Sequence, residues 1–195
     1  MILMIKKGEI TKNKQINNMT VNYLFETDKE SIKTYYKMKC KNNLFFTEEE
    51  KVNFISTVNE QLKNFLEQKE FDCILIPETK NECFKEIVKN LNYQTVMIRK
   101  RSKEEILTNL ESQKMMKAER KKLVDNIMQM EDVKIGLVAA NQRERVANVL
   151  FEDIESIKDK KVLFLDDSVF TGSTFKAIVN KFKVIDTVVL FSNKD

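Results

Sequence analysis

Short continuous apolar runs alternate with segments of helical spacing along most of the chain. The runs at 73–76 and 161–165 are typical of strands that are buried on both faces. Apolar residues recur at i, i+3, i+4 and i+7 from Phe84 and again from Phe175, which predicts a helix after each of these strands. Weaker patterns predict a helix within 28–41 and further strands at 20–26, 94–98, 133–139 and 184–191.

A longer helix is predicted just before the first buried strand. Thr47 and Glu50 form a capping-box pattern, and a stripe of apolar residues at nearly helical period follows them. We therefore expect a helix over about 48–68. Strands that alternate with helices at this spacing indicate an α/β fold, a mainly parallel twisted sheet flanked by helices. Ligands of such folds bind at the edge where the parallel strands end.

The composition is that of a globular protein. Of 195 residues, 42% are hydrophobic and 33% are charged, and the chain has three Gly and one Pro. This length makes one domain, or one domain with an appendage. No run approaches the roughly 20 apolar residues of a membrane span, and the first residues lack the apolar length and cleavage site of a secretory signal. We therefore expect a cytoplasmic protein with no membrane partner.

Missing residue types narrow the chemistry. The chain has no His, which excludes a histidine base, nucleophiles paired with His and most catalytic zinc sites. Its three Cys are widely spaced, which argues against a disulfide framework and against a zinc ribbon. The net charge of +4 permits a polyanionic partner such as nucleic acid without requiring one. Catalysis would therefore rest on carboxylates, other bases and phosphate-binding loops.

The most informative segment follows the buried strand at 161–165. Asp166 and Asp167 come first, and a loop of Thr, Gly, Ser and Thr then leads into a predicted helix. Free backbone N–H groups, hydroxyl donors and a helix dipole suit a phosphate, and Gly172 lets the backbone curl close to the anion. The carboxylates suit sugar hydroxyls, a cation or a developing positive charge. The alternative is a solvated turn followed by an ordinary helix cap.

This segment resembles the phosphoribosyl-pyrophosphate (PRPP) motif of the type I phosphoribosyltransferases. The motif has four apolar residues, two acids, three further residues and then Thr-Gly-Ser-Thr. The family usually has an apolar residue where this chain has Ser168. The resemblance implies that the protein binds PRPP with Mg²⁺, transfers the phosphoribosyl group to a nitrogen acceptor and releases pyrophosphate. Asp166 and Asp167 would be the catalytic acids, and also the candidate protein ligands of Mg²⁺. The 5′-phosphate loop would comprise Ser168, Thr171, Gly172, Ser173 and Thr174.

A basic cluster follows the strand predicted at 94–98. The family often has a similar cluster before a mobile loop, so the resemblance implies that Arg99, Lys100 and Lys103 bind pyrophosphate. Cations at this place would stabilise the charge that the leaving group gains. The alternative is a basic run that is solvated, which is the usual meaning of such a cluster.

The loop after the strand at 73–76 is a second candidate for pyrophosphate binding. The family binds pyrophosphate there through backbone N–H groups, which makes Thr79 and Lys80 candidates by resemblance. This loop has no Gly, and Pro77 is sufficient to end the strand.

A finer resemblance is to the ComF-like branch, which is associated with competence. That branch has a Gln and then Glu-Arg-x-x-Asn-Val before the final motif, and Gln142, Arg145 and Asn148 fit the order. Two further interpretations stay open. The protein is a non-catalytic PRPP- or nucleotide-binding regulator, or it is an interaction protein that works with DNA.

The resemblance also implies a division of the chain. Residues 1–70 would form a helical N-terminal part, a hood that packs on the phosphoribosyltransferase-like core at 71–195. The acceptor is not readable from the sequence, and many members of the family are homodimers. Aromatic residues of the N-terminal part either stack on an acceptor base or belong to the core: Tyr23, Phe25, Tyr35 and Tyr36.

Overall fold

Six strands form one sheet in the part of the chain that the computed structural model describes, residues 12–16, 19–29, 31–169, 172–179 and 181–193. Their order is β1-β2-β6-β5-β3-β4. β1 pairs antiparallel with β2, and every other neighbouring pair is parallel, so β2 to β6 end at one edge. The predicted mainly parallel sheet is confirmed. The strands are β1 Lys12–Ile16, β2 Met19–Thr27, β3 Cys73–Pro77, β4 Thr95–Ile98, β5 Val162–Val169 and β6 Val184–Asn193.

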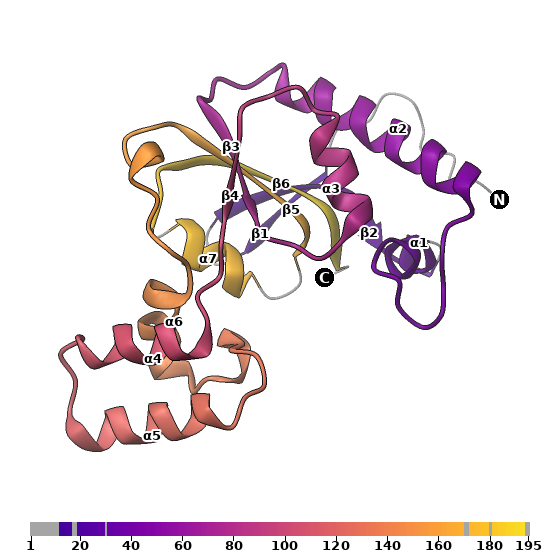
Figure 1. Cartoon of the computed structure of the whole chain (residues 1–195). Coiled ribbons are helices and arrows are strands. Elements are labelled where there is room, and N and C mark those ends of the chain that lie inside the picture. Colours follow the sequence, from indigo (N-terminus) through magenta and orange to yellow (C-terminus); the bar gives the residue numbers. More distant parts are fainter. Residues whose placement is uncertain (1–11, 17–18, 30, 170–171, 180, 194–195) are drawn as a thin grey trace.

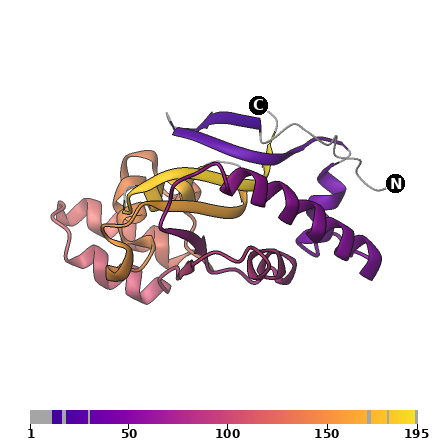
Figure 2. The same cartoon turned by 90° about the horizontal axis from the view of Figure 1, so that it is seen from above.

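Helices cover both faces of this sheet (Figure 1). α1, α2 and α3 lie on one side, and α4 to α7 lie on the other (Figure 2). Among the described residues, no helix is both long and apolar enough to cross a bilayer. The helices are α1 Ser31–Met38, α2 Glu48–Leu66, α3 Glu82–Lys89, α4 Lys103–Glu111, α5 Lys117–Met128, α6 Arg143–Leu150 and α7 Ser173–Val179.

Alternate residues of each central strand belong to two different cores. In β5, Leu163 and Leu165 pack with α1, α2 and α3, whereas Phe164 packs with α7. β3 shows the same alternation. A strand whose successive side chains are all buried has no polar face, which explains the continuous apolar runs in the sequence.

The predicted long helix is α2. Its N-terminus carries the expected capping box, because the Thr47 hydroxyl accepts from the Glu50 N–H and the Glu50 carboxylate accepts from the Thr47 N–H. A second capping box, which was not predicted, starts α4 with Ser102 and Glu105. Such boxes satisfy N–H groups that the helix itself leaves without partners.

The strand predicted at 133–139 is wrong. This segment contains η1, a 3₁₀ turn at Ile135–Leu137. Val133 and Ile135 are buried two residues apart, as in a strand, but the next buried residue is Val138, three positions further on. That spacing matches the three residues per turn of a 3₁₀ helix, so the side chains reach the core without pairing to the sheet.

The described part of residues 1–70 contributes to the same sheet as the rest of the chain. β2 pairs with β6, and α2 packs against β3, β5 and β6 through residues such as Leu62 and Phe65. The division of the chain at residue 70 stays a prediction.

Candidate functional site

β5 continues four residues past its predicted end, to Val169, and this extension separates the two acids. Asp166 lies on the same face of β5 as Phe164, toward α7. Asp167 lies on the opposite face with Leu165, toward α1 and α3. Successive residues of a strand point to opposite faces of the sheet. The two carboxylates therefore meet different surroundings at the same edge.

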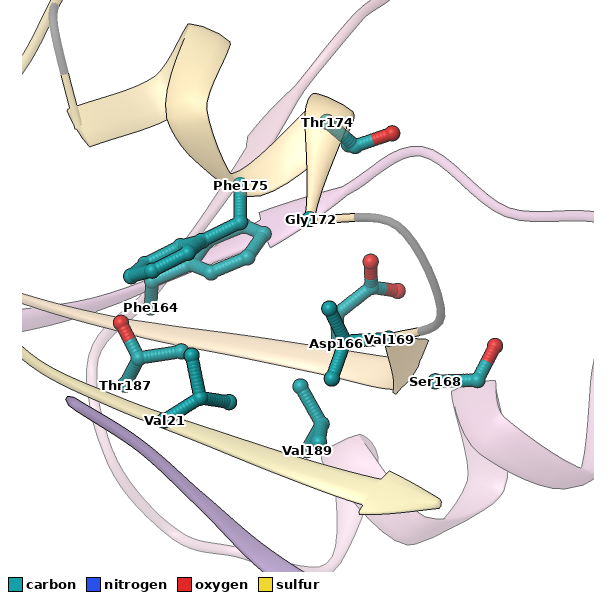
Figure 3. Close-up of a pocket in the computed structure, with 10 residues that line it drawn as sticks. All are labelled: Val21, Phe164, Asp166, Ser168, Val169, Gly172, Thr174, Phe175, Thr187 and Val189. Carbon is teal, nitrogen blue, oxygen red and sulfur yellow. The ribbon is translucent and has the colours of Figure 1, made fainter. Parts of the chain in front are cut away.

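A cavity of about 170 Å³ lies between the end of β5 and the start of α7 (Figure 3). Its mouth is polar, with Asp166, Ser168, Gly172 and Thr174. Its floor is apolar and comes from β2, β5, β6 and α7, where the Phe164 and Phe175 rings stack with centroids 6.0 Å apart. The lining residues of this floor are Val21, Phe164, Val169, Phe175, Thr187 and Val189.

Asp166 is the acid of the cavity. One of its carboxylate oxygens accepts from the Asp167 backbone N–H at 2.7 Å. Desolvation, helped by the negative charge of Asp167, raises the pKa of Asp166 from 3.8 to about 8. An acid whose charge is disfavoured in this way gains most from a hydroxyl donor or from a positive charge on a ligand.

Asp167 is buried, with 4% of its surface exposed, and three side chains donate to it. Lys39, which follows α1, lies 2.5 Å from Oδ2, and Asn81 Nδ2 donates to the same oxygen at 3.3 Å. The Ser168 hydroxyl donates to Oδ1 at 2.8 Å. Both carboxylate oxygens are therefore engaged by groups of the protein itself.

The aromatic candidates of the N-terminal part lie in or beside the core. Tyr23, Phe25 and Tyr35 are buried, and Tyr36 is half-buried. The Tyr35 hydroxyl is hydrogen-bonded to Ser168, while burial raises the pKa of this phenol. Sequence reasoning missed Lys39 and Asn81, because Lys39 is 128 residues away from Asp167 in the chain and neither residue lies in a motif.

The loop after β5 is described only in part. Gly172 has a φ of 67°, a left-handed conformation that favours glycine, and it lines the cavity. Thr174 lies at the cavity mouth. Ser173 is the first residue of α7, and its side chain, like the whole of Thr171, lies outside the described residues.

The cations after β4 are held by acids and carbonyls. Arg99 forms a bidentate pair with Glu105, both contacts at 2.8 Å, and a longer pair with Glu152 at 3.3 Å. Lys100 lies 2.7 Å from Asp132, and Lys103 donates to a backbone carbonyl of the segment after α5. These contacts join β4 and α4 to neighbouring loops rather than to the cavity. The Arg99 pair also holds the pKa of Glu105 down, at about 2.

The loop after β3 reaches the other acid. The Thr79 hydroxyl accepts from the Asn81 N–H at 3.1 Å, and Asn81 in turn caps α3 and donates to Asp167. Lys80 is exposed between them. Thr79 therefore orders the loop that contacts Asp167.

The three residues of the ComF-like pattern lie on or beside α6. Arg145 pairs with Glu119 of α5 at 3.3 Å, and the Gln142 amide donates to the Glu119 carbonyl at 3.2 Å. Asn148 is exposed. Two of the three thus join α5 to α6.

The acid pair does not provide a set of protein ligands for Mg²⁺. Among the residues that the structure describes, no three acids, cysteines or histidines gather at one point. Asp166 and Asp167 face opposite sides of β5, and Asp167 already has three donors. Mg²⁺ requires several oxygen ligands, so the described residues do not fit a cation held by both carboxylates.

No protein-family model matches the chain, and no curated protein sequence matches it either. Among solved structures it is similar to a hypoxanthine phosphoribosyltransferase from Staphylococcus aureus in two crystal forms, each with a TM-score of 0.40 and 15% identity. These alignments cover 76% and 84% of this chain and 69% and 71% of the other. It is also similar to adenine phosphoribosyltransferase from Leishmania donovani, with a TM-score of 0.44, 12% identity and coverage of 93% and 86%. The likeness to these structures is distant.

Proposed function

We propose that this protein binds PRPP and transfers its phosphoribosyl group to a nitrogen acceptor, with release of pyrophosphate. The observation that carries the proposal is the position of Asp166 in the mouth of a cavity beside Ser168, Gly172 and Thr174. This mouth lies at the edge where the parallel strands end, the place where open α/β sheets bind ligands.

The cavity suits the ribose 5-phosphate half of PRPP. Its 170 Å³ is below the roughly 300–1,000 Å³ of sites that enclose a whole drug-sized ligand, so pyrophosphate and acceptor would lie outside it. The Thr174 hydroxyl and the backbone at Gly172 would hold the phosphate, because the Ser168 hydroxyl already donates its proton to Asp167. Asp166 would accept from a ribose hydroxyl. A phosphate anchored away from the breaking bond contributes orientation at C1′.

Asp166 would also favour the reacting state over the bound substrate. Phosphoribosyl transfer builds positive charge on the ribose ring as the bond to pyrophosphate breaks. Asp166 loses its proton above about pH 8, and its carboxylate, poorly solvated and repelled by Asp167, then interacts most strongly with such a charge. Its interaction with the neutral ribose of the ground state is weaker, and this difference lowers the barrier.

Magnesium enters the proposal through the ligand. The oxygens of pyrophosphate and ribose would bind Mg²⁺, which keeps several waters when it accompanies phosphates. The cation would reduce the negative charge of the leaving group. No protein ligand is assigned to it.

A second candidate function has one observation in its favour. The three cations expected to bind pyrophosphate already have partners in the protein. Arg99 pairs with Glu105, Lys100 pairs with Asp132, and Lys103 donates to a backbone carbonyl. A protein that binds the ribose phosphate without stabilising the leaving group would be a PRPP- or nucleotide-binding regulator. Turnover distinguishes the two.

Calorimetry with PRPP and Mg²⁺ tests the proposal, with Asp166→Asn as the site variant. Asp125→Asn is the matched control, because Asp125 is exposed on α5. We expect binding by the wild type and the control. Above about pH 8, where Asp166 is charged, we expect an affinity at least about tenfold lower for Asp166→Asn, since a hydrogen bond to a charged group is lost. Pyrophosphate release in a screen of nitrogen acceptors then separates transferase from regulator. Equal affinity of all three proteins would refute the assignment of Asp166.

A further inference from the structure

We propose that Lys39 is the resident cation of the acid pair: its ammonium occupies the place on Asp167 that a divalent metal would need, so the protein itself holds no divalent metal there. The inference rests on the proposed function, because it concerns how the same site meets a sugar phosphate.

The contacts of Asp167 engage both of its carboxylate oxygens. Lys39 Nζ lies 2.5 Å from Oδ2, and Asn81 Nδ2 lies 3.3 Å from the same oxygen. Ser168 donates to Oδ1. The donors come from the end of α1, from the loop between β3 and α3, and from β5. A metal would compete with these donors, and with the charge of Lys39 above all, for the carboxylate oxygens.

Burial makes the ammonium necessary. The Asp167 side chain is 6% exposed, and a carboxylate so far from water is stable as an anion only with a charged and hydrogen-bonded partner. The Lys39 side chain is 23% exposed, so this ion pair is largely shielded from water. A fixed ammonium supplies the charge at every metal concentration, and it repels a second cation at close range.

The arrangement divides the work between the acids. Asp166 meets the ligand in the cavity, and Asp167 with Lys39 forms a neutral pair on the opposite face of β5. Ser168 connects the two, because its side chain lines the cavity and its hydroxyl donates to Asp167. Recognition of ribose 5-phosphate, which has no pyrophosphate to carry Mg²⁺, should therefore be independent of divalent metal.

Manganese binding to the ligand-free wild type is the first test, measured by electron paramagnetic resonance beside Asp167→Asn. We expect the two proteins to bind Mn²⁺ equally weakly. Mn²⁺ binding by the wild type that Asp167→Asn abolishes would overturn the inference. This measurement needs neither substrate nor turnover.

Lys39→Met tests whether the ammonium is what excludes the metal. We expect this variant to bind Mn²⁺ about tenfold more tightly than the wild type, because Asp167 loses its cation. Lys39→Arg keeps the charge, and Lys33→Met changes an exposed lysine of α1, so both should match the wild type. Unchanged Mn²⁺ affinity in folded Lys39→Met would overturn the inference. If that variant does not fold, the wild-type and Lys39→Arg measurements still decide.

Calorimetry of ribose 5-phosphate in EDTA and in Mn²⁺ completes the test. Equal affinity in the two conditions supports the inference, and a requirement for Mn²⁺ overturns it. Failure of ribose 5-phosphate to bind in either condition would count against the proposed function. The paramagnetic measurement on the free protein would then still decide the role of Lys39.

Discussion

Asp166 and Asp167 are adjacent in the chain, yet their carboxylates have different partners on opposite faces of β5. Asp166 lies at a cavity mouth with a raised pKa, and Asp167 is buried against a lysine. The difference arises because β5 stays extended through both residues, so that their side chains leave the strand on opposite faces. One carboxylate remains available to a ligand and the other joins three elements together.

The raised pKa of Asp166 predicts a pH-dependent stability. Between 3.8 and about 8 the folded protein retains a proton that the unfolded chain releases, so the free energy of unfolding falls as pH rises through this range. Asp166→Asn does not titrate. We expect the stability of this variant relative to the wild type to grow by up to about 1.4 kcal/mol per pH unit between about pH 4 and pH 8, measured by urea unfolding.

Asp125→Asn should show no such gain, because Asp125 is exposed. A constant difference between Asp166→Asn and the wild type at all pH values would show that Asp166 titrates normally. Together with the expected loss of ligand affinity, a gain in stability would mark Asp166 as a residue retained for binding rather than for folding.

Gly172→Ala tests the backbone at the cavity mouth. With φ at 67°, a side chain at this position is strained, and we expect a loss of about 1–2 kcal/mol in urea unfolding. Gly136→Ala is the control, because a Cβ there would meet no atom within 4 Å. A loss as large at Gly136 as at Gly172 would contradict the role of the left-handed conformation.

At this scale the sequence predicts half of the site. A buried strand, an acid and a Gly-containing loop predict where Asp166, Gly172 and Thr174 meet, because local order alone sets that geometry. Lys39 and Asn81 come from distant segments, and only packing of α1 and α3 on the sheet brings them to Asp167. The two acids point to opposite faces because β5 continues past its apolar residues. The apolar run alone did not predict this extension.

At the scale of the elements, the basic connection from β4 to α4 has a structural role, because its Arg101 binds the end of α6. Arg101 donates to the carbonyls of Val149 and Phe151 at the end of α6 and pairs with Asp153. Lys181 donates to the same Phe151 carbonyl and also pairs with Asp153. The last carbonyls of a helix have no partners within it, and these cations supply them.

Arg101→Met should therefore destabilise the protein. It leaves two carbonyls and one carboxylate with fewer donors, and we expect a loss of about 2–3 kcal/mol by thermal or urea unfolding. Lys158→Met removes a cation whose partner Glu155 is 80% exposed, and should change stability by less than about 0.5 kcal/mol. Equal effects of the two substitutions would refute the structural role of Arg101.

Most elements follow from periodicity, and the exceptions have physical reasons. α2, α3, β3 and β5 stand out in the sequence because apolar spacing and capping residues agree there. α4 and α5 were not predicted, since only a few apolar residues, such as Ile106 and Leu123, are buried within long polar stretches. A strand was wrongly predicted at 133–139 because its first two buried residues, Val133 and Ile135, are two positions apart, as in a strand.

At the scale of the whole molecule, α4 and α5 form part of the same core as the sheet. One cluster of buried side chains runs from Val21 of β2 through Phe164 and Phe175 to Leu110 and Ile127 in α4 and α5. In Figure 1, α6 connects the lobe of α4 and α5 to α7. A continuous core predicts that the lobe and the sheet unfold together.

Ile127→Ala tests this continuity. Ile127 is fully buried, so we expect a loss of about 2–4 kcal/mol and a single unfolding transition seen alike by circular dichroism and tyrosine fluorescence. Met128→Ala, at a neighbouring position that is 58% exposed, should be near neutral. A separate early transition in the Ile127 variant would mean that the lobe unfolds on its own.

The pairing of β2 with β6 has a consequence for the growing polypeptide. Asn22 of β2 donates to the Thr187 carbonyl of β6, 165 residues further along the chain. At roughly 5–20 residues per second, a ribosome needs about 8–33 s to make that distance. During this time β2 has β1 on one side and no parallel neighbour on the other, and unpaired strand edges are where nascent chains associate wrongly. The strand order of this sheet thus makes its early hairpin strands a natural client of chaperones during translation.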